Sequence, residues 1–203
     1  MSIEVKISNK PVSYKSAMRI LDERVNDLKL KKGNELLWIL EHPTTYTAGI
    51  RANKKEIIDK KIKIIETNRG GKITLHNPGQ KIVYFALDLN KRKKDIRRLI
   101  EIIEKSIIEF LKVYQIKGKR DNKNIGIWVN NRKIAAIGIR ISKWVAYHGC
   151  SININNNLSE YLKILPCGLS NEQVTSILDE KKIKITNINE NLKKIFLKNI
   201  KNV

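Results

Sequence analysis

The sequence has little of what several classes of protein depend on. Its two cysteines, Cys150 and Cys167, are too few for a disulfide framework or a thiolate zinc site. No apolar run approaches the ~18–20 residues that cross a bilayer. The first ten residues alternate apolar and polar side chains and lack the apolar core of a secretory signal. We therefore expect a globular protein of the reducing cytoplasm, without a membrane segment.

Acidic residues are also scarce. The 203-residue chain has 20 Asp and Glu against 41 Lys and Arg, a formal charge of +21. The excess is spread along the whole chain, so lysines on every solvated face would account for it. An acidic partner, drawn to a positive surface at a salt-dependent rate, would account for it as well. Charge alone does not choose between these explanations.

Several functional motifs are missing. Aromatic residues make up 6% of the chain, and no RNP-like, zinc-finger or helix-turn-helix pattern occurs. A basic nucleic-acid-binding module is therefore only an alternative that would explain the charge. Neither the GxxxxGK[ST] nor the GxGxxG phosphate loop is present, so a nucleotide is not implied. No serine lies in a G-x-S-x-G nucleophile elbow.

Apolar spacing predicts three long helices. The first is capped by Ser13 and stops at Gly33, and the longest covers Lys94–Tyr114. Asn187 and Glu190 form an Asn-led capping pattern for a last amphipathic helix. Ser170 and Gln173 form a capping box for a further short helix.

Alternating or continuous apolar runs predict the strands, which are separated by turns. Asn130-Asn131 fits a two-residue hairpin turn, because Asn tolerates positive φ. The predicted strands are Ile3–Ile7, Leu36–Leu40, Ile62–Glu66, Lys72–Leu75, Ile82–Leu87, Gly126–Val129, Arg132–Ile141 and Trp144–Ile154. Hairpins mixed with helices indicate an α+β fold, a mainly antiparallel sheet packed with helices, in a single domain over residues 1–203.

Three stretches contain residues that packing alone does not require. The first is RGGKITLHNPGQ at Arg69–Gln80, where paired glycines before a strand would let the backbone approach a ligand. A plain glycine turn is the alternative. The second is RKIAAIGIR at Arg132–Arg140, where Lys133 would share a strand face with Ala135, Ile137 and Ile139. Small residues leave room for a ligand there, although a solvent-facing edge lysine is the alternative.

The third stretch is Leu165-Pro166-Cys167-Gly168, immediately before the predicted short helix. Pro and Gly could fix a turn that presents the thiol, and a helix N-terminus would favour its thiolate. The alternative is a small buried hydrophobe, which Cys150, inside a strand, fits better. The three histidines have no metal-ligand spacing, so no metal site is expected, and one or two of them could line a pocket.

Together these stretches resemble the lipoyl(octanoyl) transferase family, which shares its fold with the lipoate and biotin protein ligases. The motifs occur in the family's order, and the resemblance extends from about Leu36 to about Ile177. They are Glu41-His42-Pro43 with Tyr46-Thr47, RGG-x-x-T-x-H-x-PGQ, Lys133–Gly138, His148-Gly149 with Asn153, and Pro166-Cys167-Gly168.

The resemblance implies transfer of an octanoyl group from octanoyl-acyl carrier protein to a lysine ε-amino group. The acceptor lysine lies on a lipoyl domain of 2-oxoacid dehydrogenases or on the glycine-cleavage H protein. Cys167 would carry the acyl thioester, and Lys133 would lower its pKa and handle protons. His148 could position groups or relay a proton. The implied acyl-binding residues are Arg69, Gly70, Gly71, Lys72, Ile73, Thr74, Leu75, His76, Ala136, Ile137, Gly138, Gly149, Cys150 and Ser151. No ATP, metal or other cofactor is needed, because amide formation from a thioester is downhill.

The sequence departs from the family at two positions. Leu75 and Asn77 replace the Tyr and Gly of the usual Tyr-His-Gly-Pro-Gly-Gln run. Asn is the best non-Gly substitute if that backbone is left-handed, but any hydrogen bond from the Tyr hydroxyl is lost. Two alternatives share the fold. One is an ATP-dependent lipoate or biotin ligase, and the other moves octanoyl between lipoyl-domain proteins.

Overall fold

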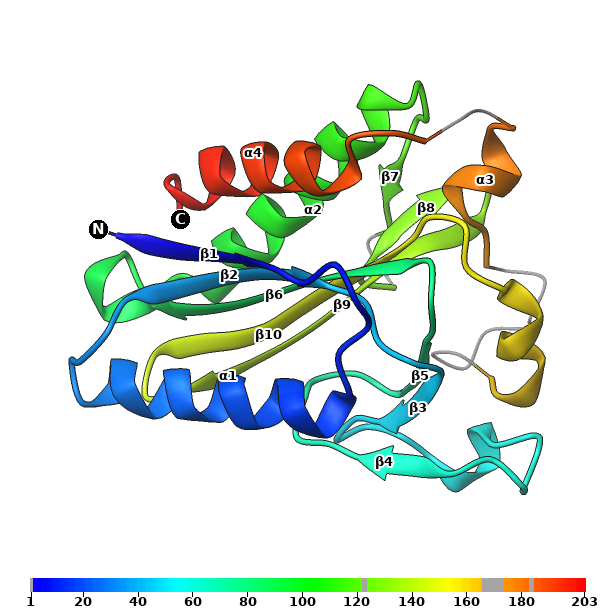
Figure 1. The fold of residues 1–203 in the computed structure, drawn as a ribbon, viewed down its shortest axis with the longest axis horizontal. Coiled ribbons are helices and arrows are strands. Elements are labelled where there is room, and N and C mark those ends of the chain that lie inside the picture. The colour runs from blue at the N-terminus through cyan, green and yellow to red at the C-terminus, as the bar shows by residue number, and fades with distance from the viewer. Residues whose placement is uncertain (1, 122–123, 166–173, 183–184) are drawn as a thin grey trace.

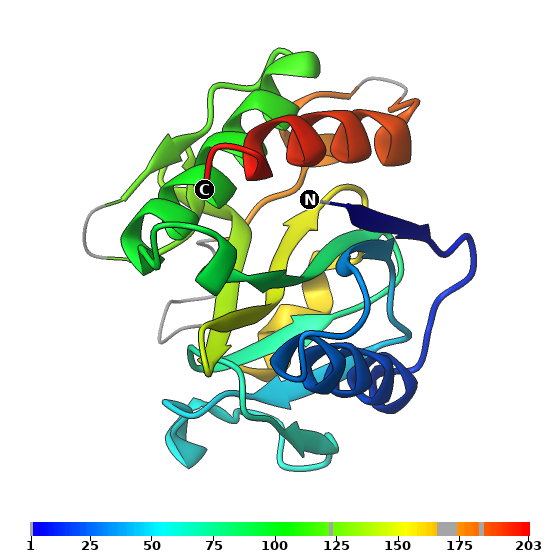
Figure 2. The same ribbon diagram turned by 90° about the vertical axis from the view of Figure 1, so that its left-hand side faces the viewer.

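The computed structural model describes residues 2–121, 124–165, 174–182 and 185–203 (Figures 1 and 2). A seven-stranded sheet forms its centre. In spatial order its strands are β1 (Ile3–Ile7), β2 (Glu35–Leu40), β6 (Gln80–Asp88), β10 (Val145–Asn153), β9 (Arg132–Ser142), β8 (Ile127–Val129) and β7 (Lys119–Arg120). β1 pairs with β2 in parallel, and the other neighbouring strands pair antiparallel. The α+β prediction with a mainly antiparallel sheet is confirmed.

A smaller sheet lies beside the end of the central one, at the lower right of Figure 1. Its strands are β4 (Ile64–Glu66), β3 (Thr45–Ala48) and β5 (Ile73–His76), with β3 in the middle. The sequence pattern missed β3, because its four residues carry no long apolar run. β3 is a strand because it pairs with both neighbours, in parallel with β4 and antiparallel with β5.

Helices cover both faces of the central sheet. α1 (Tyr14–Lys29) packs on one face, and α2 (Ile96–Val113) lies with α4 (Ile188–Ile200) on the other (Figure 1). A short helix, α3 (Ile177–Glu180), precedes α4. Three 3₁₀ turns complete the described elements: η1 (Lys54–Glu56), η2 (Leu89–Lys91) and η3 (Leu158–Lys163). No helix in these parts of the chain is long and apolar enough to span a membrane.

Helix starts show where local reasoning worked. The Ser13 side chain accepts a hydrogen bond from the Ser16 N–H at 3.2 Å, which confirms it as the cap of α1. Asn187 is the N-cap residue of α4, as predicted, but it does not cap the helix with its side chain. This residue adopts a left-handed conformation with φ of +56°, and its side chain makes no capping bond. The capping box at Ser170 and Gln173 lies outside the described residues, and the next described helix, α3, is capped by Ser176.

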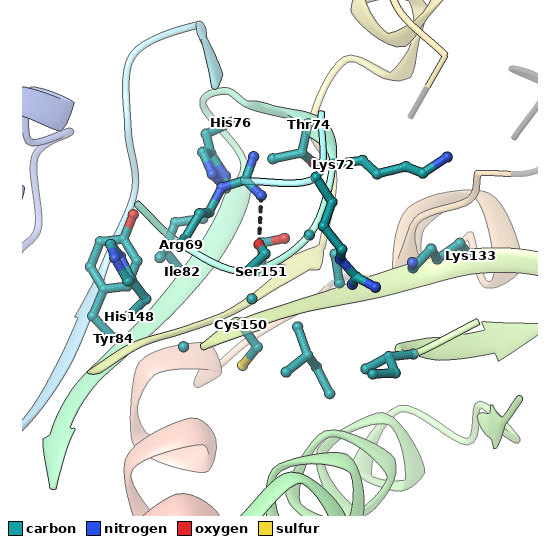
Figure 3. A pocket seen from close by; sticks show the side chains of 18 of the residues that line it. Arg69, Lys72, Thr74, His76, Ile82, Tyr84, Lys133, His148, Cys150 and Ser151 are labelled. Atoms are coloured by element: carbon teal, nitrogen blue, oxygen red, sulfur yellow. Dashed lines mark hydrogen bonds between the residues drawn. The ribbon is translucent and has the colours of Figure 1, made fainter. Parts of the chain in front are cut away.

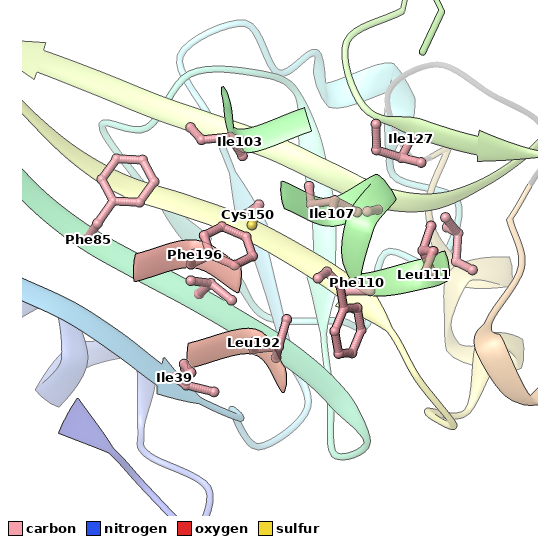
Figure 4. Close-up of a cluster of buried hydrophobic side chains, with 14 of the residues drawn as sticks. Ile39, Phe85, Ile103, Ile107, Phe110, Leu111, Ile127, Cys150, Leu192 and Phe196 are labelled. Atoms are coloured by element: carbon pink, nitrogen blue, oxygen red, sulfur yellow. The ribbon is translucent and has the colours of Figure 1, made fainter. Parts of the chain in front are cut away.

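The hydrophobic core fills the space between the sheet and the α2–α4 layer (Figure 4). Phe85 and Ile39 from the sheet meet Phe110 of α2 and Phe196 of α4, all at 0% exposure. Cys150 belongs to this cluster, as expected for a small buried hydrophobe. Burial raises the pKa of its thiol, so Cys150 stays protonated and inert.

The hairpin predicted over 126–141 is present and contains one irregularity. Asn130 and Asn131 both have positive φ, +48° and +63°, as a two-residue turn requires. Ile127 pairs with Ala135 and Trp128 with Lys133, which leaves Ile134 as an extra residue on β9.

The bulge at Ile134 overturns the predicted face of Lys133. Ile134 and Ala135 both join the core on the α2–α4 side. Lys133 therefore does not share a face with Ala135, Ile137 and Ile139.

Candidate active site

A cavity of about 210 Å³ lies between the sheet and the segment that joins β4 to β5 (Figure 3). Its floor is formed by β6, β10 and β9, and its roof by the loop that begins at Arg69. The lining residues are Arg51, Arg69, Gly70, Gly71, Lys72, Thr74, His76, Ile82, Tyr84, Asn124, Ile125, Lys133, Ala136, Ile137, Gly138, His148, Gly149, Cys150 and Ser151. Two of the three stretches singled out in the sequence, Arg69–Gln80 and Arg132–Arg140, thus contribute residues to one space. Of the third stretch only Leu165 is described, and it does not line the cavity.

Most of the predicted site residues line this cavity, with three exceptions. Ile73 and Leu75 do not, because β5 alternates its side chains and turns these two into a separate apolar cluster with Tyr46. Cys167 lies outside the described residues, as do its neighbours Pro166 and Gly168. The side chain of Cys150 points away from the cavity, on the opposite side of the strand from Ser151 (Figure 3).

Two glycines, Gly70 and Gly138, allow the loop that forms the roof to lie close to the sheet. The Gly70 N–H donates a hydrogen bond to the Ile139 carbonyl at 3.3 Å. A Cβ on Gly70 would lie 2.9 Å from that oxygen, and one on Gly138 would lie 3.1 Å from the Gly70 oxygen. The Arg69 guanidinium, which is buried, donates to the carbonyl and hydroxyl oxygens of Thr47, both at 2.8 Å. The Arg69-Gly70-Gly71 loop therefore packs directly against β9, at Gly138 and Ile139.

Lys133 lies at one end of the cavity with only 8% of its surface exposed. Its Nζ is 5.5 Å from the centre of the Trp128 ring, a cation–π distance. Gly126 leaves room for the lysine stem, since a Cβ there would lie 2.6 Å from Cε. The edge-strand alternative, a lysine in solvent, does not hold for a residue this buried.

The described residues on either side of 166–173 are both tied to this region. Thr175 N–H donates to the Lys133 carbonyl at 3.0 Å, and Val174 bridges Lys133. Leu165 N–H donates to the carbonyl of Glu56 at 2.7 Å. The Glu56 carboxylate pairs with Lys72, which lines the cavity, at 2.9 Å. The chain therefore enters and leaves the 166–173 segment beside the cavity.

Two of the three histidines line the cavity, and both are neutral. The His76 Nδ1 lies 2.8 Å from the Gln80 Oε1. Burial, followed by the effect of His42, lowers the pKa of His76 to about 3. Burial, followed by the charge of Arg69, lowers the pKa of His148 to about 3. The cationic groups of this site are thus arginine and lysine.

The backbone at His148 is unusual. Its φ of +67° lies in the left-handed region although it is in the middle of β10. Neighbouring side chains of a strand normally point to opposite faces, yet the rings of Tyr147 and His148 stack with centroids 4.8 Å apart. The left-handed residue therefore breaks the alternation and turns the imidazole toward the cavity, where Nε2 lies 2.8 Å from the Asn68 Oδ1.

Five lining residues were not anticipated from the sequence: Arg51, Ile82, Tyr84, Asn124 and Ile125. Ile82 and Tyr84 alternate on β6, so they share a face, but only the pairing register places them beside Ser151 and Gly149. Among the described residues, no group of three or more His, Cys, Asp or Glu could hold a metal ion.

Comparisons with known proteins agree with this geometry. The family described as lipoyl protein ligase A/B catalytic domain matches residues 13–197. An octanoyltransferase of Bartonella tribocorum is 44% identical over 191 residues, 87% of this chain and 78% of the relative. An octanoyltransferase of Wolbachia pipientis wMel is 43% identical over 198 residues, 95% of this chain and 97% of the relative.

The fold is also that of a solved structure, lipoate-protein ligase A bound with ATP. The TM-score is 0.77 with 14% identity, over 98% of this chain and 86% of that one. At this identity the likeness concerns the fold alone.

Proposed function

The chain belongs to the lipoyl protein ligase A/B catalytic domain family, and we propose how it performs octanoyl transfer. The octanoyl group passes from octanoyl-acyl carrier protein, through a thioester on Cys167, to a lysine ε-amino group of a lipoyl domain. Relatives 44% and 43% identical over most of the chain are octanoyltransferases, so the chain is an acyltransferase that carries octanoyl for protein lipoylation. The residues that carry out the steps are the proposal.

The observation that carries the proposal is the position of Lys133. It lies buried at the end of the cavity, and its carbonyl accepts a hydrogen bond from Thr175, eight residues after Cys167. A free thiol with a pKa of about 8.5 is only a few per cent ionised at neutral pH. A nearby ammonium favours the thiolate and raises that fraction.

The reaction balances without a cofactor. The Cys167 thiolate attacks the octanoyl carbonyl, and the phosphopantetheine thiolate leaves and takes a proton from the Lys133 ammonium. The incoming lysine amine then attacks the enzyme thioester and gives a proton to the neutral Lys133 amine, which restores the Cys167 thiolate. Backbone N–H groups near Gly168 and in the Arg69–Gly71 loop stabilise the oxyanion.

The cavity supplies the acyl slot. Ala136, Gly138, Gly149 and Ser151 are small, so the floor of the sheet leaves space beneath the roof. Seven carbons beyond the carbonyl, at ~0.8 kcal/mol each, contribute roughly 5–6 kcal/mol on burial. His76 and His148 are neutral there, which suits an uncharged chain.

The donor is octanoyl-acyl carrier protein, and the acceptor is a lipoyl domain of a 2-oxoacid dehydrogenase or the glycine-cleavage H protein. The net charge of +21 would steer acidic carriers to this surface, with a rate that falls as salt increases. The cytoplasm is the compartment we propose, because the reaction needs a reduced thiol.

The test is incubation with octanoyl-acyl carrier protein in the absence of ATP, followed by intact-mass analysis. We expect one octanoyl adduct, which peptide mapping places on Cys167. Cys167→Ser should carry no adduct, whereas Cys150→Ala, the matched cysteine variant, should still carry it. Lys133→Ala should slow adduct formation by about a hundredfold or more.

A different result would redirect the assignment. An octanoyl adduct on Cys150, or a normal adduct in Cys167→Ser, would overturn the role of Cys167. Transfer that requires ATP and free octanoate would identify the ATP-dependent ligase reaction instead.

A further inference from the structure

The two ends of the cavity differ in exposure. At the Lys133 end Asn124 and Ile125 are exposed, with 47% of Ile125 accessible. At the other end Tyr84 and His148 are only 5% and 3% accessible. Figure 3 shows Lys133 on one side of the lining residues and the Tyr84–His148 pair on the other. The cavity is therefore open toward the Lys133 end and closed at Tyr84.

We propose that the ring of Tyr84 is the stop that sets the length of the bound acyl chain, with His42 as the residue that holds it in place. The proposal rests on the octanoyl transfer above and adds the residue that determines its chain-length specificity.

The size of the residues in the sheet points to Tyr84. Across β9, β10 and β6, the row Ala136–Ser151–Ile82 has two small residues and one of medium size. In the next row, Gly138 and Gly149 have no side chain, and Tyr84 is opposite Gly149. The tyrosine is thus the one residue with a side chain in this row of β9, β10 and β6.

Hydrogen bonds fix the ring. The Nδ1 of the fully buried His42 is 2.6 Å from the Val12 carbonyl, so this nitrogen donates, and Nε2 accepts from the Tyr84 hydroxyl at 2.9 Å. Burial raises the pKa of Tyr84 well above its usual value, so the hydroxyl keeps the proton it donates. The hydroxyl is engaged outside the slot, and the ring carbons face the acyl chain.

His148 supports the ring from the side. Its imidazole meets Tyr84 edge-on with centroids 6.4 Å apart, and the other side of the imidazole stacks on Tyr147. The left-handed backbone at His148 is what places it there. Tyr84 therefore contacts a histidine on each of two sides, which restricts its movement away from a longer chain.

The dimensions agree with a medium-length chain. β9 advances five residues from Lys133 to Gly138, roughly 16 Å at ~3.3 Å per residue and somewhat less across the bulge. Octanoyl spans seven carbon–carbon bonds from its carbonyl to its methyl carbon, about 8–9 Å at the rise per bond of an extended chain. The span is therefore long enough for an octanoyl chain together with the Lys133 side chain and the reacting groups.

The experiment compares Tyr84→Leu with Tyr147→Leu. Both substitutions shorten a buried tyrosine that contacts His148, but Tyr147 does not line the cavity. Octanoyl- and decanoyl-acyl carrier protein compete in one reaction, so the product ratio does not depend on how much enzyme is folded. Tyr84→Leu should raise the decanoyl-to-octanoyl ratio at least tenfold, the effect of about one methylene in an apolar pocket. Tyr147→Leu should leave the ratio within about twofold. Tyr84→Phe keeps the ring but loses the hydrogen bond to His42, so it should raise the ratio by less than Tyr84→Leu does.

A second readout separates this inference from the proposed function. Isothermal titration calorimetry with octanoate, decanoate and dodecanoate should show that Tyr84→Leu favours the longer acids. If the wild type transfers octanoyl but neither measurement moves in Tyr84→Leu, the stop is not Tyr84 and the function stands. If binding shifts as expected but no transfer occurs, the slot assignment stands and the transferase proposal fails. An equal shift in Tyr147→Leu would mean that loosened packing, and not the ring, sets the length.

Discussion

The two faces of the central sheet are built from the same strands but are filled differently, with the cavity of Figure 3 on one face and the core of Figure 4 on the other. On the α2–α4 face, large apolar side chains such as Phe85, Phe110 and Phe196 interlock with no exposure. The other face is covered by α1 over one part and by the Arg69–His76 segment over the rest. Small residues under that segment keep the space open. Side-chain size along the strands, together with the left-handed backbone at His148 and the bulge at Ile134, therefore separates a core from a binding site.

The largest expected effect comes from adding a side chain at Gly149, on the floor of the cavity. A Cβ there would lie 1.9 Å from the Val83 carbonyl oxygen of β6, a contact that requires the backbone to move. Gly149→Ala should therefore lower the free energy of unfolding by about 3 kcal/mol or more. Urea denaturation followed by circular dichroism measures the loss.

Gly138→Ala is the matched control for that substitution. Its Cβ would lie 3.1 Å from the Gly70 oxygen, which belongs to a loop and can shift by a few tenths of an ångström. We expect a loss of about 1 kcal/mol. Equal losses in the two variants would contradict the view that Gly149 is required by the pairing of β10 with β6.

A smaller effect is expected from pH, because the residues that make stability depend on pH lie on the cavity face. The buried histidines lie on the cavity side, and burial lowers the folded-state pKa of His76 and of His148 to about 3, below the ordinary 6.5. The unfolded chain binds protons first, so stability is complete above about pH 6.5 and falls progressively between pH 6.5 and pH 3. At pH 5 the titration of each of these histidines should lower the free energy of unfolding by about 2 kcal/mol relative to its value at neutral pH.

Unfolding free energies at pH 7.5 and pH 5 test this expectation. His76→Asn should lose less stability between the two pH values than the wild type, whatever its stability at pH 7.5. A pH dependence that is the same in the variant would mean that His76 does not titrate on unfolding in this range.

The smallest expected effect is on the α2–α4 face. Ile107 is fully buried in the core cluster, and Ile107→Val removes one methyl group. The free energy of unfolding should fall by about 1 kcal/mol. The decanoyl-to-octanoyl product ratio should not change, because this face does not border the acyl slot. A changed ratio would show that the two faces are coupled through the sheet.

Local patterns predicted much of this fold from the sequence. The cap at Ser13 and the Asn130-Asn131 turn depend on residues within a few positions, and both are present. β3 is a strand only because β4 and β5 pair with it, which no window of four residues reveals. Asn187 occupies the predicted N-cap position of α4, but its backbone is left-handed and its side chain makes no capping hydrogen bond, which its residue type alone does not reveal.

The candidate site could be predicted where motifs alone define it. The Arg69–His76 and Lys133–Gly138 stretches were found by their composition and the family resemblance, and both meet at the cavity. Tyr84 was missed because its place depends on the register between β6 and β10, which brings it opposite Gly149. The strand face predicted for Lys133 was wrong, because one extra residue in β9, Ile134, shifts the alternation of side chains between the two faces.

The left-handed backbone at position 148 also limits how this protein can diverge. A β-branched residue such as Val or Ile is strained there, whereas Gly, Asn, Asp and His adopt the conformation more readily. Many substitutions of His148 would therefore cost backbone energy as well as the imidazole. Because one residue supplies both the left-handed backbone and the imidazole, we expect His148 to be substituted more slowly than the surface lysines.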